Sequence, residues 1–387
     1  MVKMPSRFSY GENEIQAISE VIEYYKSKNE DPGYQGYFEE KFCHEFSEFM
    51  GGGYTDAVAT GTASLFVALQ ALQLPKGSNI LISPVTDSGP LNCIILLGLN
   101  PIVIDSAQNS YNISLEQFKK RITKNSSALL LVHTGGEPVT DTKEIVDEAH
   151  KNNIKVIEDC SQATGALIGS QKVGSFGDIA AFSTMYRKNL IAGSSGGLVF
   201  TKDKELYHLA LAYADRGKQV WRNDLNQNDP SNSLFPALNL NTDEISCAIG
   251  SASLKRLQDT IDKRLAFLEY FIPLLKSKSK FCTPYNFTKN FSPFFFPIFV
   301  DAENLSCTKI EFAQALSKEG IGNNAHYGCV ISEWEWAKKY YKDSFKAANA
   351  VYVRDNSFNL FLNEKYTIED ADIIIDVICS LENEFKK

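Results

Sequence analysis

The sequence predicts an α/β protein, in which a large domain with a mainly parallel central sheet is followed by a smaller α+β domain. Short aliphatic and β-branched runs alternate with segments of helical period between residues 57 and 200. Several of these runs end in a polar residue or a glycine-containing turn, where open parallel sheets bind their ligands. A long segment of helical period over residues 254–276 then follows. We therefore expect a large domain at residues 1–253 and a small domain at residues 254–387.

Each predicted element rests on its own periodicity and on the residues at its ends. Helices are predicted at residues 12–26, 37–49, 60–72, 84–98, 115–122, 142–151, 204–215, 254–276, 309–318 and 367–385. Strands are predicted at residues 57–59, 79–83, 101–104, 128–132, 155–158, 179–182 and 294–300. The polar, irregular segment at residues 216–233 predicts a mobile loop over a substrate site.

The composition is typical of a globular protein and argues against several partners. The net charge of −8 does not suit a nucleic-acid surface, although a few local donors can still bind an anionic substrate. No run of 18 apolar residues indicates a membrane span. The eight cysteines are scattered without a CxxC pair, which favours reduced thiols in the cytoplasm. His133 has no partner ligand at a useful spacing, so we expect no metal.

The most informative stretch of the sequence lies between residues 155 and 200. One apolar run ends in Glu158 and Asp159, and a second run ends in Ser183, with Lys188 shortly after it. Pyridoxal phosphate chemistry needs such a pair, because a lysine forms a Schiff base and a carboxylate faces the pyridinium nitrogen. Taken singly, an aspartate at a strand end is more commonly a turn residue or helix cap, and a lysine a solvated charge. The order of Asp159 and Lys188 in the chain, and the residues around them, favour the chemical interpretation.

A second candidate site follows the first predicted strand. The turn Thr60-Gly61-Thr62-Ala63-Ser64 opens a helix. Amides in the first turn of a helix lack intrahelical partners, so this arrangement is suited to binding an anion. Many helices start in a similar way, and the turn alone is therefore weak evidence.

The segments EDCSQATGA and KVGSFGDIAAFSTMYRKNLIAGSSGG resemble the signature of the DegT/StrS-type sugar aminotransferases. The positions that match are Asp159, Gln162, Gly165, Gly174, Gly177, Asp178, Phe182, Ser183, Lys188, Asn189, Gly196 and Gly197. The resemblance implies a fold-type-I enzyme with pyridoxal 5′-phosphate as its cofactor. It further implies a homodimer with shared active sites that moves an amino group, usually from glutamate, to a nucleotide-linked keto-sugar.

The resemblance also assigns roles residue by residue. Lys188 would form the Schiff base and act as the general base, while Asp159 keeps the pyridine nitrogen protonated. The residues expected to contact the cofactor are Gly61, Thr62, Ala63, Asp87, Asp159, Gln162, Ser183 and Lys188, with Asn239 supplied by the neighbouring subunit. Helix capping is the competing interpretation of Asn239. His326, in a GNNAHY turn, and Arg216, in the polar loop, are the candidate substrate contacts.

Two departures from the family pattern stand out. Asp87 occupies a place where an aromatic ring usually stacks on the pyridine, so either it points elsewhere or it contacts a polar substrate group. Leu240 and Asn241 replace a tyrosine and an arginine after Asn239. These departures keep a non-catalytic scaffold open as an alternative. A sugar dehydratase of the same fold is a further alternative, although that branch carries histidine at the position of Lys188.

Overall fold

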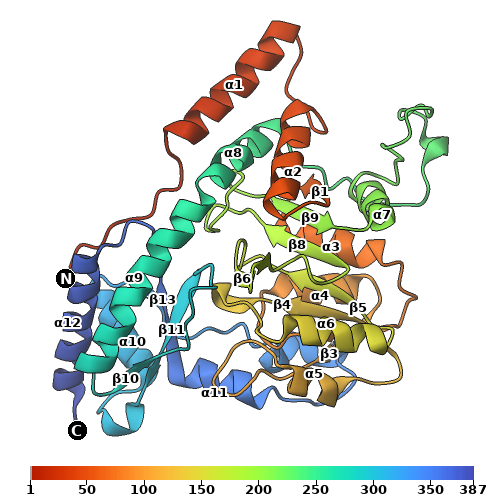
Figure 1. The fold of residues 1–387 in the computed structure, drawn as a ribbon. Coiled ribbons are helices and arrows are strands. Elements are labelled where there is room, and N and C mark those ends of the chain that lie inside the picture. The colour runs from red at the N-terminus through yellow and green to blue at the C-terminus, as the bar shows by residue number, and fades with distance from the viewer. Residues whose placement is uncertain (1) are drawn as a thin grey trace.

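The computed structural model describes residues 2–387 and contains one large and one smaller sheet, both flanked by helices (Figure 1). The large sheet has the order β1-β9-β8-β5-β4-β2-β3. Its strands are β1 (Tyr54–Val58), β2 (Asn79–Ile82), β3 (Asn100–Val103), β4 (Ser126–Val132), β5 (Lys155–Asp159), β8 (Ile179–Ser183) and β9 (Gly197–Thr201). The strands from β8 to β3 are parallel to their neighbours, while β9 pairs antiparallel with both β8 and β1. The predicted α/β fold with a mainly parallel central sheet is confirmed.

Helices cover both faces of the large sheet, which explains why its central strands are apolar throughout. Successive residues of β2 point to opposite faces. Ile80 and Ile82 pack in the core on one face, with α3 (Gly61–Ala71), α4 (Ser88–Leu96) and α7 (Lys204–Ala214). Leu81 packs in the core on the other face, with α5 (Leu115–Arg121) and α6 (Thr142–Lys151).

The smaller sheet is antiparallel, with the order β10-β11-β13-β12. Its strands are β10 (Cys282–Pro284), β11 (Phe295–Val300), β12 (Asn323–Asn324) and β13 (Ser357–Phe361). The helices α10 (Lys309–Lys318), α11 (Ala348–Asn356) and α12 (Ile368–Phe385) accompany it. A separate hairpin joins β6 (Leu167–Ile168) to β7 (Gln171–Lys172).

The predicted long helix at residues 254–276 differs from the observed one at its start. The chain forms α8 (Glu244–Lys255) and then α9 (Leu257–Lys278), because Arg256 leaves helical geometry with φ −103° and ψ 0°. α9 packs against α12. The predicted domain division between residues 253 and 254 falls inside α8 and stays a proposal.

The N-terminal helices α1 (Glu12–Lys28) and α2 (Tyr37–Phe49) pack on α8, and α1 extends away from the large sheet (Figure 1). Phe42 and Phe46 of α2 are buried, as their helical spacing predicts. Ile15 and Ile22 of α1 are 54% and 46% exposed. One side of α1 therefore presents apolar surface to solvent.

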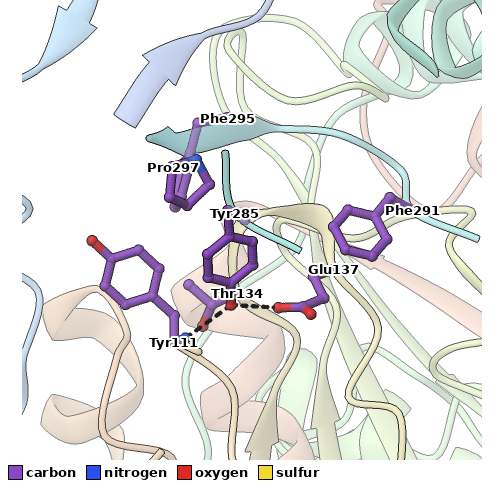
Figure 2. Close-up of a pocket in the computed structure, with 8 residues that line it drawn as sticks. Tyr111, Thr134, Glu137, Tyr285, Phe291, Phe295 and Pro297 are labelled. Atoms are coloured by element: carbon purple, nitrogen blue, oxygen red, sulfur yellow. Dashed lines mark hydrogen bonds between the residues drawn. The ribbon is translucent and has the colours of Figure 1, made fainter. Parts of the chain in front are cut away.

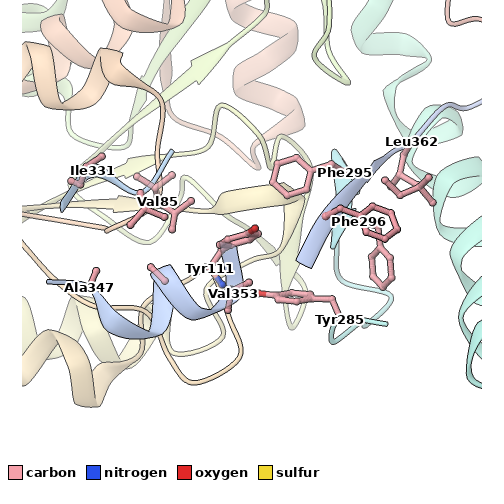
Figure 3. Close-up of a cluster of buried hydrophobic side chains, with 14 of the residues drawn as sticks. Val85, Tyr111, Tyr285, Phe295, Phe296, Ile331, Ala347, Val353 and Leu362 are labelled. Atoms are coloured by element: carbon pink, nitrogen blue, oxygen red, sulfur yellow. Dashed lines mark hydrogen bonds between the residues drawn. The ribbon is translucent and has the colours of Figure 1, made fainter. Parts of the chain in front are cut away.

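A single hydrophobic core joins the large sheet to the smaller one. Val85, which follows β2, and Tyr111 belong to the same buried cluster as Phe295 and Phe296 of β11 (Figure 3). An isolated antiparallel bridge also pairs Val85 with Val330. The segments that carry the candidate site are thus supported from both sheets. Among residues 2–387, no helix combines the length and apolarity needed to cross a membrane.

Candidate active site

Three of the predicted site segments meet at one edge of the large sheet. Asp159 ends β5 and pairs with Ala181 of the neighbouring strand β8, so it lies close to the end of β8 at Ser183. Gly197 of β9 pairs with Ser183 on one side and with Val58 of β1 on the other. The turn that follows β1 is therefore brought beside the carboxyl ends of β5 and β8. This is the edge at which α/β sheets bind ligands.

The turn after β1 fits tightly against Ser183. A Cβ atom added to Gly61 would lie 2.6 Å from the Ser183 Cβ, and one added to Gly197 would clash with the Thr60 carbonyl. Thr60 caps α3, since its Oγ1 accepts a hydrogen bond from the Ala63 amide at 2.8 Å. The helix N-terminus, with its partial positive charge, faces the Ser183 side chain. Of the amides predicted to bind phosphate, that of Ala63 already has this intramolecular partner.

Lys188 lies in the loop between β8 and β9, and its backbone N–H donates to the Met185 carbonyl at 2.8 Å. Part of the side chain reaches the surface, yet desolvation of the amine lowers the pKa of Lys188 from 10.5 to about 8. The charges of Asp159 and Asp87 oppose this shift, so both carboxylates act on the amine electrostatically. The Nζ atom lies 4.6 Å from the centre of the Phe294 ring, a cation–π distance.

Asp159 is buried, and burial raises the pKa of its carboxyl, while the Ser161 amide and Lys188 oppose that rise. The Oδ1 atom accepts a hydrogen bond from the Ser161 N–H at 3.0 Å. Gln162 is held at both ends of its amide: Oε1 accepts from the Gly135 N–H at 2.7 Å, and Nε2 donates to the Tyr327 hydroxyl at 3.1 Å. The acid and the amide are therefore both fixed before any ligand binds.

Asp87 caps a helix, a role that neither of the two alternatives drawn from the sequence includes. Its Oδ1 accepts from the Gly89 N–H at 3.0 Å at the start of α4. The side chain is exposed, and its charge still raises the pKa of Lys188. The nearest aromatic contact of the Lys188 amine comes instead from Phe294, which precedes β11 in the other sheet.

The remaining predicted contacts make hydrogen bonds of their own, and the segment of Asn239 runs beside the end of β1, where the Ala59 N–H donates to the Leu240 carbonyl at 2.8 Å. Asn239 does not cap α8, since Asp243 is the N-cap residue; the Asn239 Oδ1 instead accepts from the backbone and side-chain amides of Asn241. Arg216 is paired with Asp215 and with the Tyr34 hydroxyl, at 2.6 and 2.7 Å. His326 is exposed as a whole residue. Partial desolvation of its ring and, to a smaller extent, the charge of Lys309 lower the pKa of His326.

A profile of the DegT/DnrJ/EryC1/StrS aminotransferase family matches residues 11–379, nearly the whole chain. The chain belongs to this family. The aminotransferases of the family use pyridoxal 5′-phosphate, and that is the cofactor of this enzyme. The resemblance drawn from the motifs between Glu158 and Gly197 is thereby confirmed.

Similar proteins include a GDP-perosamine synthase of Escherichia coli O157:H7, which is 32% identical over 234 residues. That alignment covers 59% of this chain and 61% of the relative, so the chain matches less than two thirds of its length. The spore coat polysaccharide biosynthesis protein SpsC of Bacillus subtilis is 28% identical over 378 residues, 95% of this chain and 94% of the relative.

The solved structures that resemble this DegT-family chain share its fold. An aminotransferase from Psychrobacter cryohalolentis superposes with a TM-score of 0.89 at 23% identity, covering 99% of this chain and 100% of the other. A GDP-4-keto-6-deoxy-D-mannose-3-dehydratase from Escherichia coli gives a TM-score of 0.87 at 22% identity, covering 96% and 98%. Since both activities occur on this fold, the fold alone does not separate them.

The geometry of this DegT-family site fits the cofactor. A small-residue turn at a helix N-terminus, tight against Ser183, suits a phosphate group. A buried carboxylate and an amine of lowered pKa act on one another electrostatically, as the two edges of a pyridine ring require. Bound there, pyridoxal phosphate supplies an aldehyde that accepts amines and a ring that withdraws electrons.

His133, Glu158 and Cys160 lie with one ligand atom each within 4.8 Å of one another, although their spacing in the sequence did not indicate a cluster. The protein already uses the ligand atoms of His133 and Glu158. The His133 Nδ1 accepts from the Val139 N–H, and its Nε2 lies 3.1 Å from the Glu158 carboxylate. Glu158 also accepts from the Gly174 and Gly177 amides. The trio therefore fixes the loops around β5, and we assign no metal to it.

Sequence reasoning missed two aromatic contacts of this site. Phe294 lies against the Lys188 amine, and Tyr327 bonds Gln162. Tyr327 directly follows the predicted substrate contact His326, so the GNNAHY turn pointed to the correct segment. Phe294 stands in a run of three phenylalanines whose periodicity gives no sign of a role.

Glu137, a half-buried acid, lines the same pocket as Gly135 (Figure 2). Glu137 accepts from the Tyr285 hydroxyl at 2.7 Å and from the Asn112 side-chain amide at 2.9 Å. Burial raises the pKa of Glu137 to about 7, against the opposing effect of these donors. Phe295 also lines this pocket, and its ring makes an edge-to-face contact with the Tyr327 ring. The acid therefore supports the loop that holds Gln162.

Proposed function

We propose that this enzyme transfers an amino group from glutamate to a nucleotide-linked keto-sugar, in the biosynthesis of an amino sugar. The observation that carries the proposal is that Asp159 ends β5 beside β8, whose following loop carries Lys188, and that the charges of these two side chains act on one another's pKa. GDP-perosamine synthases and a dTDP-3-amino-3,6-dideoxy-α-D-galactopyranose transaminase among the similar proteins support the substrate class.

Each residue has a role in the proposed reaction. The Lys188 amine would hold the cofactor through its aldehyde and, when free, would move the proton between the donor Cα and the cofactor C4′. An amine with a pKa of about 8 serves both directions of this transfer near neutral pH. Asp159 holds the proton on the ring nitrogen, and Gln162 orients the ring oxygen.

The proposed phosphate contacts come from the turn after β1 and from Ser183. Gly61 leaves room for the phosphate, and the Thr62 amide donates to it together with the Ser183 hydroxyl. The Ala63 amide joins them by giving up its hydrogen bond to the Thr60 hydroxyl. Asp87, at the start of α4, is kept as a contact on the face of the cofactor ring, where its charge acts on the Lys188 amine. Arg216 and His326 are kept as substrate contacts, the former in the long loop at residues 216–233.

We further propose a cytoplasmic homodimer in which Asn239 of one subunit reaches the phosphate in the other. The described hydrogen bonds of Asn239 use only its Oδ1 atom, which leaves its amide donors for a ligand. Leu238 beside it is 58% exposed, and α1 carries exposed apolar residues, as an interface requires. Light scattering of the purified protein tests the dimer, and a monomer at micromolar concentration would contradict it.

The function is tested with the purified protein, pyridoxal phosphate, glutamate and GDP-, dTDP- or UDP-linked keto-sugars. We expect 2-oxoglutarate and an aminated nucleotide sugar in equal amounts. Lys188→Ala should abolish both the visible absorbance of the bound cofactor and its borohydride-trapped adduct. A protein that stays colourless with pyridoxal phosphate would favour a scaffold, and release of ammonia with a deoxygenated sugar would favour a dehydratase. Lys188 itself argues against the dehydratase.

A further inference from the structure

The backbone of the lysine loop is bound by an arginine from the N-terminal segment. Arg7 donates from NH2 to the Lys188 carbonyl at 2.7 Å and from NH1 to the Tyr186 carbonyl at 3.0 Å. Its Nε lies 3.1 Å from Oε1 of Glu364, which follows the smaller sheet. Arg7 thus uses three donors to connect the loop with a distant acid.

A second arginine binds the other side of the same loop. Arg264 of α9 is only 1% exposed, and its NH1 donates to the Asn189 Oδ1 at 2.6 Å, next to Lys188. Its NH2 donates to Oε2 of Glu364 at 2.7 Å. The two arginines therefore share one carboxylate. They lower the pKa of Glu364 to about 2 even though burial alone would raise it.

The same network also places the aromatic ring beside the amine. Arg264 NH1 donates to the Pro293 carbonyl at 2.9 Å, and Asn189 donates to the Ser292 hydroxyl at 2.9 Å. Phe294 directly follows Pro293 in the chain, and its ring lies 4.6 Å from the Lys188 Nζ. One buried guanidinium therefore fixes both the loop that carries the amine and the segment that carries the ring.

We propose that Arg7, Arg264 and Glu364 are positioning residues that set the location of the Lys188 amine, an inference that rests on the proposed role of Lys188. Stability alone is a weak explanation, because burying such an ion network costs much of its Coulombic gain. The planar guanidinium of an arginine, in contrast, holds its partners in fixed positions through several directed N–H donors, which the ammonium of a lysine cannot do. Small displacements of a reacting group cost large factors in rate.

The chain offers a matched control in Arg256. Its Nε lies 2.7 Å from the buried Glu14, and its NH2 donates to the Ser9 carbonyl at 2.7 Å. Arg256 therefore ties the N-terminal segment to the helices much as Arg7 does, but its described hydrogen bonds reach the lysine loop only indirectly, through Ser9, whose hydroxyl lies 3.5 Å from the Tyr186 carbonyl. Arg256→Gln should reproduce the loss of an ion pair without disturbing Lys188.

The test measures how fast pyridoxal phosphate forms a borohydride-trappable adduct at Lys188 across pH, in protein stripped of cofactor. In the wild type the rate should rise with a midpoint near pH 8, where the amine loses its proton. Arg7→Gln, Arg7→Lys and Arg264→Lys should loosen the loop, hydrate the amine and move the midpoint upward. We expect the rate at pH 8 to fall about tenfold. Arg256→Gln should keep the wild-type profile at a comparable loss of melting temperature.

Arg7→Gln is the deciding variant, because Arg7 is partly exposed and its loss should leave the fold intact. The inference is overturned if Arg7→Gln and Arg264→Lys match Arg256→Gln in both rate and midpoint. A wild-type protein that forms no adduct at Lys188 would instead refute the proposed function. Recovery of the profile in Arg7→Lys would show that charge suffices, which would also overturn a geometric role.

Discussion

The Gln162 amide donates to the Tyr327 hydroxyl across 3.1 Å, and this bond joins the large sheet to the segment beside the smaller one. The other end of the amide is held by the Gly135 N–H. Gln162 therefore presents a fixed orientation toward the expected cofactor ring. Loss of the Tyr327 hydrogen bond should therefore weaken cofactor binding.

Tyr327→Phe should weaken cofactor binding and leave the fold in place. The variant keeps the ring that packs on Phe295 and removes the hydroxyl that Gln162 and Cys329 contact, of which the Gln162 bond is worth about 1 kcal/mol. We expect about fivefold weaker binding of pyridoxamine phosphate, measured by fluorescence titration. Tyr340→Phe, on the exposed surface, is the control and should bind as the wild type does. Equal affinity in Tyr327→Phe would mean that Gln162 needs no support from this hydroxyl.

Asp159→Asn should separate cofactor capture from chemistry. The near-isosteric amide still fits the buried site, but it cannot hold the ring nitrogen in its protonated form. We expect affinity for the cofactor to change only a few-fold, while kcat falls at least about 100-fold. Single-turnover absorbance with glutamate measures the chemical step directly. A variant with near-normal kcat would remove Asp159 from the mechanism.

Gly61→Ala should impair the phosphate site through steric contact alone. The added methyl group would lie 2.6 Å from Ser183 Cβ and would push the helix N-terminus away from that side chain. We expect at least about tenfold weaker binding of pyridoxal phosphate by absorbance titration. Gly33→Ala is the matched control, because nothing lies within 4 Å of its new methyl group. The prediction is refuted if the two variants bind the cofactor equally well.

Glu137→Gln should change how stability depends on pH. The pKa of Glu137 is raised from 4.5 to about 7 in the folded protein, so the folded state binds more protons than the unfolded state within that interval. Raising the pH from 4.5 through 7 should therefore destabilise the wild type through this group. The glutamine variant should lose that slope in melting temperature. Glu116→Gln, on the exposed face of α5, should keep it.

The sequence predicts the central sheet well because its signals are local. β2, β4 and β5 are short apolar runs, and Asp159 is the polar residue at the end of one of them. β9 and β13 were not predicted. Their identity depends on antiparallel pairing with distant partners, which leaves no periodic signal in segments of five residues. The break at Arg256 likewise interrupts a helical period that the sequence shows as continuous.

The residues of the site likewise fall into those that local sequence signals predict and those that only tertiary contacts bring in. Lys188 and Asp159 follow strand ends, so their meeting could be inferred from the order of the elements. Phe294 contacts the Lys188 amine and Arg7 contacts the Lys188 carbonyl, from segments about 100 and 180 positions away, and only tertiary packing brings them there. Asp87 differs from these residues. The sequence singled it out for its charge, and the structure shows that it also serves as a helix cap.

The contact between Arg7 and Glu364 spans 357 positions of the chain. Because a chain is synthesised from its N-terminus, Arg7 can meet its partner only after residue 364 has been made. The large sheet is complete in sequence by Thr201, so this anchorage of the lysine loop needs a residue made long after the strands that flank the loop.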